Sequence, residues 1–334
     1  MKTKYNKFAF DFDGTLVDAN LQPKDGVVDM FYDILTKVEN PKILICTGSG
    51  LKEVAIFLNK LFAKLEEKQL NEDEAEFLAF EKPNIDIACF GGAFIIKNNG
   101  KGEIVWNKKI SVEQYNQVRQ IINSFDKSSL IILQTMEGLF YNEPKKVKNK
   151  IKVAVLKSIK SLIGYSGINV TSLNSEQYNK KVKDSEVYSL NIITSEIEDN
   201  GKLMQKMQEA NVGADLSINT SIQIRNGSKL NAIKRAFNIE NGEGLVYVGD
   251  GLNDILAMKF ASLSLAVGNN VKVLTTANYA LESIADASDI MFTEADYSKI
   301  SCKVIQNAIN KNKWAKKQTN LDDNLDIMEG NLLI

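Results

Sequence analysis

The sequence predicts an α/β protein in which a parallel sheet is covered by helices on both faces, with an α+β module inserted into it. Two patterns support this prediction. Near both ends of the chain, short apolar runs alternate with helical patterns, and such continuously apolar runs are typical of strands buried on both faces. In the middle of the chain, strand-like runs follow one another closely, which indicates antiparallel pairing.

The strands expected in the parallel sheet are short apolar runs that end in small or polar residues. They are 8–12, 43–46, 87–90, 245–248, 263–267 and 290–292, and helical patterns follow the first two at 28–38 and 51–65. Ligands of such sheets gather at the carboxyl ends of the strands. Asp11, Thr47 and Asp250 each follow an apolar run, so we expect them at one edge of the sheet.

The inserted α+β module is expected at 93–224, which leaves 1–92 and 225–334 as a discontinuous core. A Gly-containing loop between two apolar runs predicts a hairpin at 93–107. The other elements expected here are helices at 112–125 and 202–210, strands at 130–134, 139–142 and 187–194, and a hairpin or bent strand at 215–224. Antiparallel strands with helices on one face suit such a module.

Composition excludes several classes of function. The 334 residues are 44% hydrophobic, and 41 Lys and Arg balance 42 Asp and Glu, so no excess of positive charge indicates binding to nucleic acid or an anionic membrane. The chain has no histidine, which excludes histidine bases and histidine-ligated metals. No run approaches the roughly 18 apolar residues of a membrane span, and the polar N-terminus resembles no signal peptide, so we expect a cytoplasmic protein.

Two charged segments have less specific interpretations. The charge-rich stretch 59–82 is expected to form a solvated helical extension. The acidic tail 321–334 ends in apolar residues and either frays or docks on a neighbouring surface. The sequence names neither the substrate nor the oligomeric state.

Asp11 and Asp13 are the most informative pair in the sequence. They are two residues apart at the end of the first strand, so their side chains leave the strand on one face. Like charges this close repel unless a cation or a phosphoryl group lies between them. Mg²⁺-assisted phosphoryl transfer needs such a pair, because one carboxylate can attack phosphorus and the other can protonate the leaving oxygen. Gly14 permits the turn that follows.

Three further segments contain candidate ligands. The Thr47 hydroxyl and the backbone N–H groups of Gly48 and Ser49 can bind phosphoryl oxygens at a helix start, although a simple helix cap would use the same residues. Lys229 begins a helical pattern, where a cation is disfavoured unless it faces a ligand. Asp250 and Asp254 can supply oxygen ligands to Mg²⁺, and the alternative is an Asp-Gly turn with a helix cap.

These four segments resemble, in order, the four motifs of the haloacid dehalogenase superfamily, and the chain is most similar to its Cof-type (IIB-like) phosphatases. The first and fourth motifs, 11–15 and 249–254, are the most specific. The resemblance implies a Rossmann-like three-layer α/β/α core and an inserted α+β cap domain. It covers nearly the whole chain apart from 59–82 and the C-terminal tail.

The resemblance also implies a role for each matching residue. Asp11 would be the nucleophile and Asp13 the general acid and base. The phosphoryl group would be bound by Thr47, Gly48 and Lys229, with Asn253 supporting the loop or the phosphate. Mg²⁺ would be bound by Asp11, the backbone carbonyl of Asp13 and Asp250, with Asp254 close by or acting through water.

Two positions depart from the pattern of this branch. Ser49 stands where arginine is common, and Gly91 stands where asparagine is common. Both positions face the substrate in relatives, so the usual contacts to the leaving group are expected to differ here.

The favoured function is a Mg²⁺-dependent phosphatase that hydrolyses a small phosphorylated metabolite, such as a sugar or polyol phosphate, through an aspartyl-phosphate intermediate. A phosphomutase or phosphotransferase on the same scaffold is the alternative, because both need the same aspartate pair. A signalling module of the receiver type is less consistent with the chain, since receivers are shorter and lack the second acid. The complete set of carboxylates also argues against a catalytically silent relative.

Overall fold

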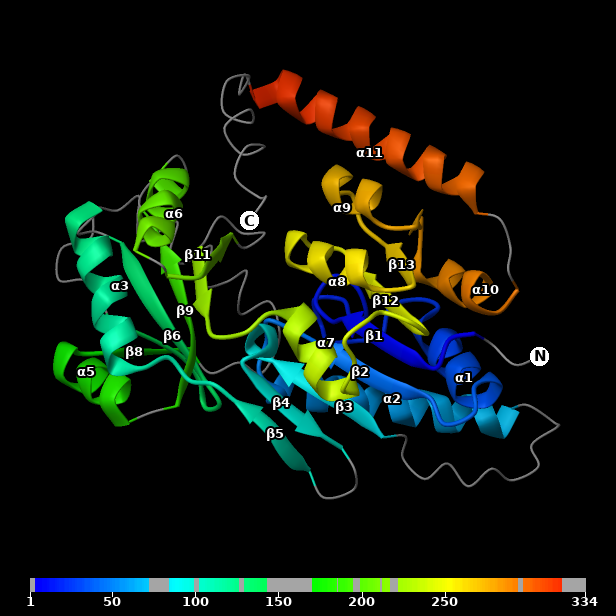
Figure 1. Ribbon diagram of the computed structural model, residues 1–334, viewed down its shortest axis with the longest axis horizontal. Coiled ribbons are helices and arrows are strands. Elements are labelled where there is room, and N and C mark those ends of the chain that lie inside the picture. Colours follow the sequence, from blue (N-terminus) through cyan, green and yellow to red (C-terminus); the bar gives the residue numbers. More distant parts are fainter. Residues whose placement is uncertain are drawn as a thin grey trace.

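The computed structural model describes residues 4–71, 84–98, 102–125, 129–142, 170–184, 186–194, 199–210, 212–216, 222–293 and 297–319. Its centre is an eight-stranded sheet of order β14-β13-β12-β1-β2-β3-β4-β5 (Figure 1). The strands are β1 (Lys7–Asp11), β2 (Lys42–Cys46), β3 (Ile85–Cys89), β4 (Phe94–Lys97), β5 (Glu103–Asn107), β12 (Leu245–Gly249), β13 (Leu263–Ala266) and β14 (Tyr279–Ala280).

The position of β1 between β12 and β2 determines where its terminal aspartate lies. All three strands are parallel, with Phe10 in register with Val248 and Asp11 in register with Cys46. The residues that follow these strands therefore meet at one edge of the sheet. The sheet is parallel from β14 to β3, and β4 and β5 extend it in antiparallel fashion.

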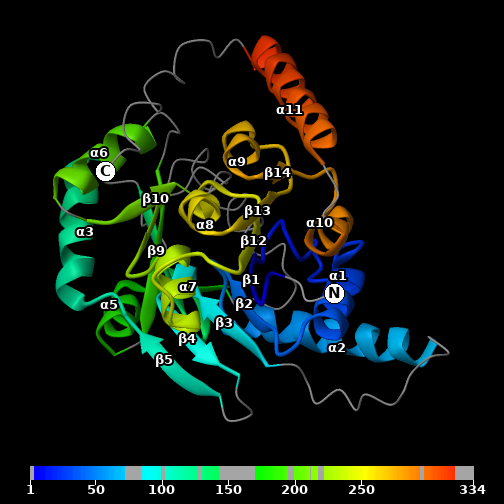
Figure 2. The same cartoon turned by 45° about the vertical axis from the view of Figure 1, so that its right-hand side comes forward.

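Helices cover both faces of this sheet (Figures 1 and 2). Phe8 and Phe10 of β1 contribute to a core with one helical layer, whereas Ala9 contributes to the core on the opposite face, as the two-residue period of a strand requires. The first layer contains α1 (Val27–Lys37), α2 (Leu51–Asn71) and α10 (Ala287–Phe292), and the second contains α7 (Lys229–Phe237), α8 (Ile255–Phe260), α9 (Val271–Thr276) and α11 (Ser298–Thr319). The predicted three-layer α/β core is confirmed.

A second, six-stranded sheet has the order β10-β11-β9-β6-β7-β8. Its strands are β6 (Leu130–Thr135), β7 (Gly138–Asn142), β8 (Val170–Leu173), β9 (Val187–Ile193), β10 (Ala214–Leu216) and β11 (Ile222–Arg225). The helices α3 (Val112–Phe125), α5 (Ser175–Asp184) and α6 (Asp199–Glu209) share a core with one face of it. Tyr188 of β9 stacks on Phe90 with ring centroids 4.6 Å apart, which joins this sheet to the core.

Two expectations differ from the structure. Residues 290–292 lie in helix α10 rather than in a strand, because a capping box between Ser283 and Asp286 starts the helical turn η3 (Ile284–Asp286) that leads into α10. The predicted hairpin at 93–107 forms as β4 and β5, but it extends the eight-stranded sheet instead of joining the second one.

The division into domains at 93 and 225 stays a prediction. Strand β8 and helix α5 were not expected.

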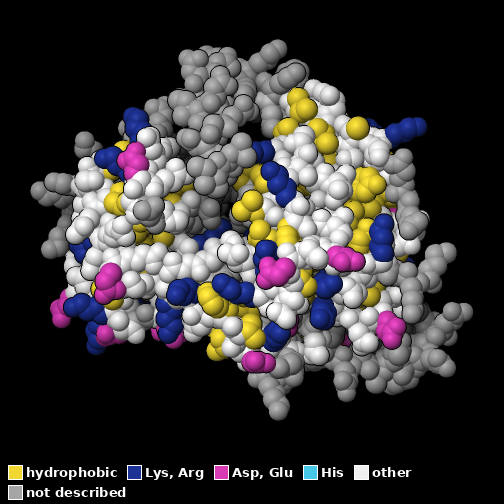
Figure 3. Space-filling model, viewed as in Figure 1, with side chains coloured by type: hydrophobic (Ala, Val, Ile, Leu, Met, Phe, Trp, Pro, Cys, Tyr) yellow, Lys and Arg dark blue, Asp and Glu magenta, His cyan; other side chains and the backbone are white. Residues whose placement is uncertain are grey.

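The charged segments are only partly described. The expected helical extension continues to Asn71, and both its remainder, 72–82, and the tail 321–334 lie outside the described residues. No helix within the described ranges is long and apolar enough to cross a membrane. On the face of the molecule in Figure 3, basic and acidic side chains are interspersed.

Candidate active site

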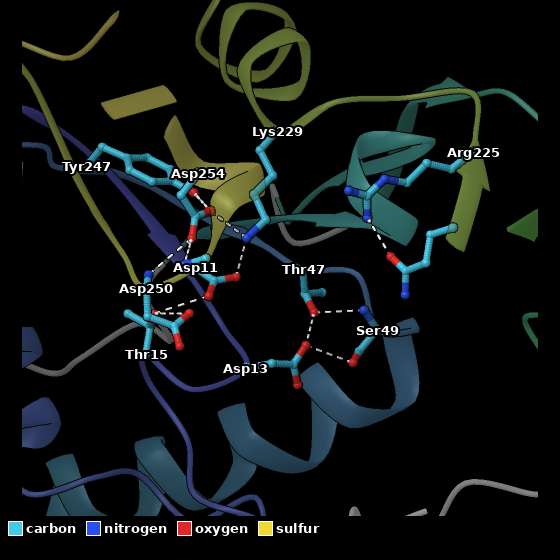
Figure 4. Close-up of polar contacts among 12 residues, drawn as sticks. Asp11, Asp13, Thr15, Thr47, Ser49, Arg225, Lys229, Tyr247, Asp250 and Asp254 are labelled. Atoms are coloured by element: carbon cyan, nitrogen blue, oxygen red, sulfur yellow. Dashed lines mark hydrogen bonds and ion pairs between the residues drawn. The ribbon is translucent and has the colours of Figure 1, made fainter. Parts of the chain in front are cut away.

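Asp11 lies at the carboxyl end of β1 and is 4% exposed. Its Oδ1 accepts a hydrogen bond from Lys229, and its Oδ2 accepts one from the hydroxyl of Thr15 at 3.1 Å (Figure 4). Carboxylate oxygens of Asp11, Asp250 and Asp254 all lie within 4.8 Å of one another. Three acids therefore surround one point at the edge of the sheet. We call these three residues the acidic cluster.

Lys229 is the first residue of α7 and is buried against this cluster. Ser228 caps the helix by accepting a hydrogen bond from the N–H of Asn231, which fixes where Lys229 leaves the helix. The Nζ atom of Lys229 lies 2.6 Å from Oδ1 of Asp254. Burial acts to lower the pKa of Lys229, but the charges of Asp11 and Asp254 outweigh this effect and raise it above the ordinary value. The ammonium group is therefore charged at neutral pH.

Asp254 holds the loop that carries Asp250. Its Oδ1 also accepts a hydrogen bond from the hydroxyl of Tyr247 at 2.5 Å. Its Oδ2 accepts hydrogen bonds from the backbone N–H groups of Gly251 at 2.8 Å and Asp250 at 3.1 Å. Because both oxygens are already used, Asp254 acts chiefly as the anchor of this loop.

Asp250 packs against the turn after β1. Gly14 has a φ of +81°, and a Cβ there would lie 2.3 Å from Oδ2 of Asp250, so only glycine leaves room for this carboxylate. Burial, followed by the negative charge of Asp11, raises the pKa of Asp250 to about 9. Such crowding of acids is relieved by a cation, and a set of carboxylate oxygens fits a hard divalent ion such as Mg²⁺.

Asp13 points to a different set of partners. Its Oδ2 accepts hydrogen bonds from the hydroxyls of Thr47 and Ser49, both at 2.9 Å, and the Thr47 hydroxyl accepts one from the N–H of Ser49 at 2.8 Å (Figure 4). The carboxylates of Asp11 and Asp13 are thus held by separate groups. The Asp13 carboxylate does not belong to the acidic cluster, although its backbone carbonyl remains the predicted ligand.

Most of the predicted site residues come together. One hydrogen-bonded network consists of Asp11, Lys229, Asp250 and Asp254, and a second joins Asp13 to Thr47. The carbonyl of Gly48 accepts a hydrogen bond from Gln134 of the second sheet at 3.1 Å, so this sheet covers the Thr47 loop. Asn253 is exposed, and no hydrogen bond in the described part of the chain joins it to the acidic cluster.

Four contributors were not assigned from the sequence. Thr15 belongs to the first motif but has no role of its own there, and for Ser49 the sequence suggests only a backbone N–H donor, not the hydroxyl that binds Asp13. Tyr247 lies inside an apolar strand, where nothing in the sequence shows that its hydroxyl reaches Asp254. Arg225 ends β11, and its guanidinium lies against Gly91, where a Cβ would be 2.5 Å from the arginine Nε. Only the glycine at position 91 offers a signal for this contact.

Comparison with known proteins identifies the family of the chain. The haloacid dehalogenase-like hydrolase family matches residues 8–291 of the chain, which include both networks. No curated protein matches the chain in sequence.

Solved structures share the fold. A haloacid dehalogenase-like hydrolase from Bacteroides thetaiotaomicron is 15% identical, with a TM-score of 0.63 over 86% of this chain and 100% of that one. A protein from Plasmodium vivax described as a HAD/COF-like hydrolase is 18% identical, with a TM-score of 0.61 over 92% and 96%. A haloacid dehalogenase subclass IIB sugar phosphatase is 18% identical, with a TM-score of 0.60 over 85% and 98%. At these identities the likeness establishes the fold.

Proposed function

The chain belongs to the haloacid dehalogenase-like hydrolases, a family of phosphatases and phosphotransferases, and from this premise we propose that it is a Mg²⁺-dependent phosphatase acting through an aspartyl-phosphate. The observation that supports this most is the arrangement of Asp11 and Asp13. One lies in an acidic cluster beside a buried ammonium group, and the other is held apart by two hydroxyls. Two carboxylates in different surroundings suit two different roles.

In the first step, a carboxylate oxygen of Asp11 attacks the phosphorus atom, and the bond from phosphorus to the leaving oxygen breaks. Asp13 donates its proton to that oxygen, so the leaving group departs as a neutral alcohol. Thr47 and Ser49 donate to Oδ2 of Asp13, and we assign proton transfer to Oδ1. Lys229 and the backbone N–H of Gly48 bind the phosphoryl oxygens.

In the second step, Asp13 removes a proton from a water molecule, whose oxygen attacks the phosphorus of the aspartyl-phosphate. The bond between Asp11 and phosphorus breaks, which releases inorganic phosphate and regenerates both carboxyl groups. Lys229 lies beside Asp11 in both steps and compensates its negative charge.

Asp11, the backbone carbonyl of Asp13 and Asp250 would hold the metal ion, with Asp254 anchoring the loop or acting through water. When bound, Mg²⁺ supplies positive charge that neutralises the acidic cluster and the transferring phosphoryl group. Without it, burial and then the negative charge of Asp11 raise the pKa of Asp250 to about 9, so its carboxyl group holds a proton at neutral pH.

The second sheet would act as the cap that selects the leaving group and excludes water. Its Gln134 already contacts Gly48 on the phosphate-binding loop. One structure of the same fold is a sugar phosphatase, which supports a sugar or polyol phosphate as the substrate class.

Phosphate release from a set of phosphorylated metabolites, with p-nitrophenyl phosphate as a general substrate, tests this proposal. We expect release that requires Mg²⁺ and stops with excess chelator. A phosphomutase would instead release little phosphate and convert one sugar phosphate into its isomer. Release that does not depend on a divalent ion would contradict the proposal.

A further inference from the structure

We propose that Arg225 and Asn191 bind the leaving group of the substrate, and that this group carries a second acidic group together with hydroxyls. The inference rests on the proposed phosphatase function and adds the chemical class of its substrate. The inference is based on the polar side chains of the second sheet that lie on the face next to the loop carrying Thr47.

Arg225 reaches this loop from the end of β11 and is 9% exposed. Gly91 has a φ of +64°, and a Cβ there would lie 2.5 Å from the Cδ, Nε and Cζ atoms of Arg225. The N–H of Gly91 donates to the carbonyl of Thr47 at 2.7 Å. The guanidinium therefore passes over Gly91, where any side chain would collide with it, directly beside the loop that carries Thr47. Figure 4 shows it pointing inward, towards Lys229 and Thr47.

The sheet register places polar side chains next to Arg225. Arg225 is paired with Ser189 of β9, and Ser189 is paired with Gln134 of β6, so the three side chains form a row on one face. The hydrogen bond from Gln134 to the carbonyl of Gly48 shows that this face covers the phosphate-binding loop. Gln223 accepts a hydrogen bond from Nη1 of Arg225 at 3.3 Å, which orients the guanidinium.

Asn191 belongs to the next row of the same face. It is paired with Gln223 on one side and Ile132 on the other, and it is 1% exposed. Its Oδ1 has no hydrogen-bond partner within the described residues. A buried carbonyl oxygen without a donor is costly, so a ligand that brings a donor would satisfy it.

The side chains of Arg225 and Asn191 would bind two different kinds of chemical group on a ligand. The planar guanidinium of arginine binds carboxylate and phosphate groups through two parallel hydrogen bonds, and an amide oxygen accepts from a hydroxyl. The hydroxyls of Thr47 and Ser49 are engaged with Asp13, so recognition of the leaving group falls to the second sheet. Phosphorylated sugar acids and sugar bisphosphates carry both an anion and hydroxyls.

Two matched pairs of substrates test the inference. In the first pair, 3-phosphoglycerate differs from glycerol 3-phosphate by a carboxylate. In the second pair, fructose 1,6-bisphosphate differs from fructose 6-phosphate by a phosphate. Values of kcat and KM are measured for both pairs and for p-nitrophenyl phosphate, with the wild type, Arg225→Gln, Arg225→Lys and the control Arg119→Gln. Arg119 lies exposed on α3, so its substitution removes the same charge away from the site.

In at least one pair, we expect the wild type to prefer the substrate that carries the additional anionic group. A preference in the first pair would indicate that Arg225 binds a carboxylate, and a preference in the second pair would indicate that it binds a phosphate. Arg225→Gln should reduce that preference by about 10- to 100-fold, mainly through KM. Arg225→Lys should keep an intermediate preference because it retains the charge but not the planar fork. Arg119→Gln should behave as the wild type.

The inference is overturned if the wild type hydrolyses p-nitrophenyl phosphate but prefers neither 3-phosphoglycerate nor fructose 1,6-bisphosphate over its partner in the pair. It is also overturned if both Arg225 variants slow all five substrates by one common factor, which would place Arg225 on the reacting phosphoryl group or in the fold. A wild type that releases phosphate from none of the five would instead contradict the proposed function itself.

Discussion

The ammonium of Lys229 lies 2.6 Å from Oδ1 of Asp254, and the two side chains are 2% and 0% exposed. Lys229 contacts Asp11 as well, so two buried carboxylates share one cation. Removing the cation would leave both charges buried without compensation, which costs far more than an exposed ion pair contributes. Lys229, which we propose to bind the phosphoryl group, is therefore also a residue on which the fold depends.

Lys229→Met is expected to lower the free energy of unfolding by about 3–5 kcal/mol, because it leaves Asp11 and Asp254 without a counter-charge. Urea unfolding measures this loss. Lys234→Met is the matched control on the same helix, since Lys234 is partly exposed and lies 3.6 Å from the exposed Glu240. The control should lose about 0.5 kcal/mol or less. Equal losses in both variants would argue against a stabilising role for the buried ion pairs of Lys229.

Gly14→Ala is expected to displace Asp250, because the new Cβ would lie 2.3 Å from its Oδ2. Mg²⁺ affinity and turnover should fall by about 10- to 100-fold, as for other residues that orient a metal ligand. In Gly102→Ala the alanine would occupy a similar positive φ of +68°, but among the described residues its Cβ would meet only Ile96, at 3.5 Å. Its expected effect is limited to about 1 kcal/mol of strain. Isothermal titration with Mg²⁺ compares the two, and normal affinity in Gly14→Ala would count against the contact.

Ser49→Ala is expected to lower kcat by about tenfold, because it removes one of the two hydroxyls that orient Asp13. Because Ser49 is a positioning residue, the change should appear in kcat and in the pH profile rather than in KM. Ser49→Thr retains a hydroxyl and should restore most of the activity. Unchanged kcat and pH dependence in Ser49→Ala would show that Thr47 alone orients Asp13.

Mg²⁺ binding should strengthen as pH rises towards 9. Burial and the charge of Asp11 raise the pKa of Asp250 to about 9 in the absence of a metal ion, so the folded protein holds a proton that the ion must displace. The same proton stabilises the metal-free fold at low pH, and this contribution is lost as pH rises through the raised pKa. The increase in Tm caused by Mg²⁺ should therefore be larger at pH 8 than at pH 6. A shift that is independent of pH would contradict this linkage.

Much of the core follows from local patterns in the sequence. The runs before Asp11, Thr47 and Asp250 are strands of one sheet, and parallel pairing brings their ends together without further information. The strand expected at 290–292 is a helix in the structure, because three apolar residues do not distinguish a buried strand from a buried helical face. The hairpin at 93–107 was recognised, but a hairpin pattern does not say which sheet it joins.

The site was less predictable wherever it depends on contacts between distant segments. Ser49 differs from the usual residue of the family branch, and only the structure shows its hydroxyl on Asp13. Arg225 and Gly91 are far apart in the chain, and neither alone indicates that one makes room for the other. Such pairings arise from the relative placement of two sheets, which periodicity and motif spacing do not encode.

In the proposed reaction, the carboxylate of Asp11 attacks the phosphorus atom of the substrate. Release of inorganic phosphate from p-nitrophenyl phosphate by Asp11→Asn, in the presence of Mg²⁺, tests it most directly. Asp29→Asn is the control with the same chemical change, because Asp29 is 66% exposed and bound to Lys68. We predict no release above background from Asp11→Asn and wild-type release from Asp29→Asn, with both variants folded by circular dichroism. Sustained release from folded Asp11→Asn would show that Asp11 is not the nucleophile.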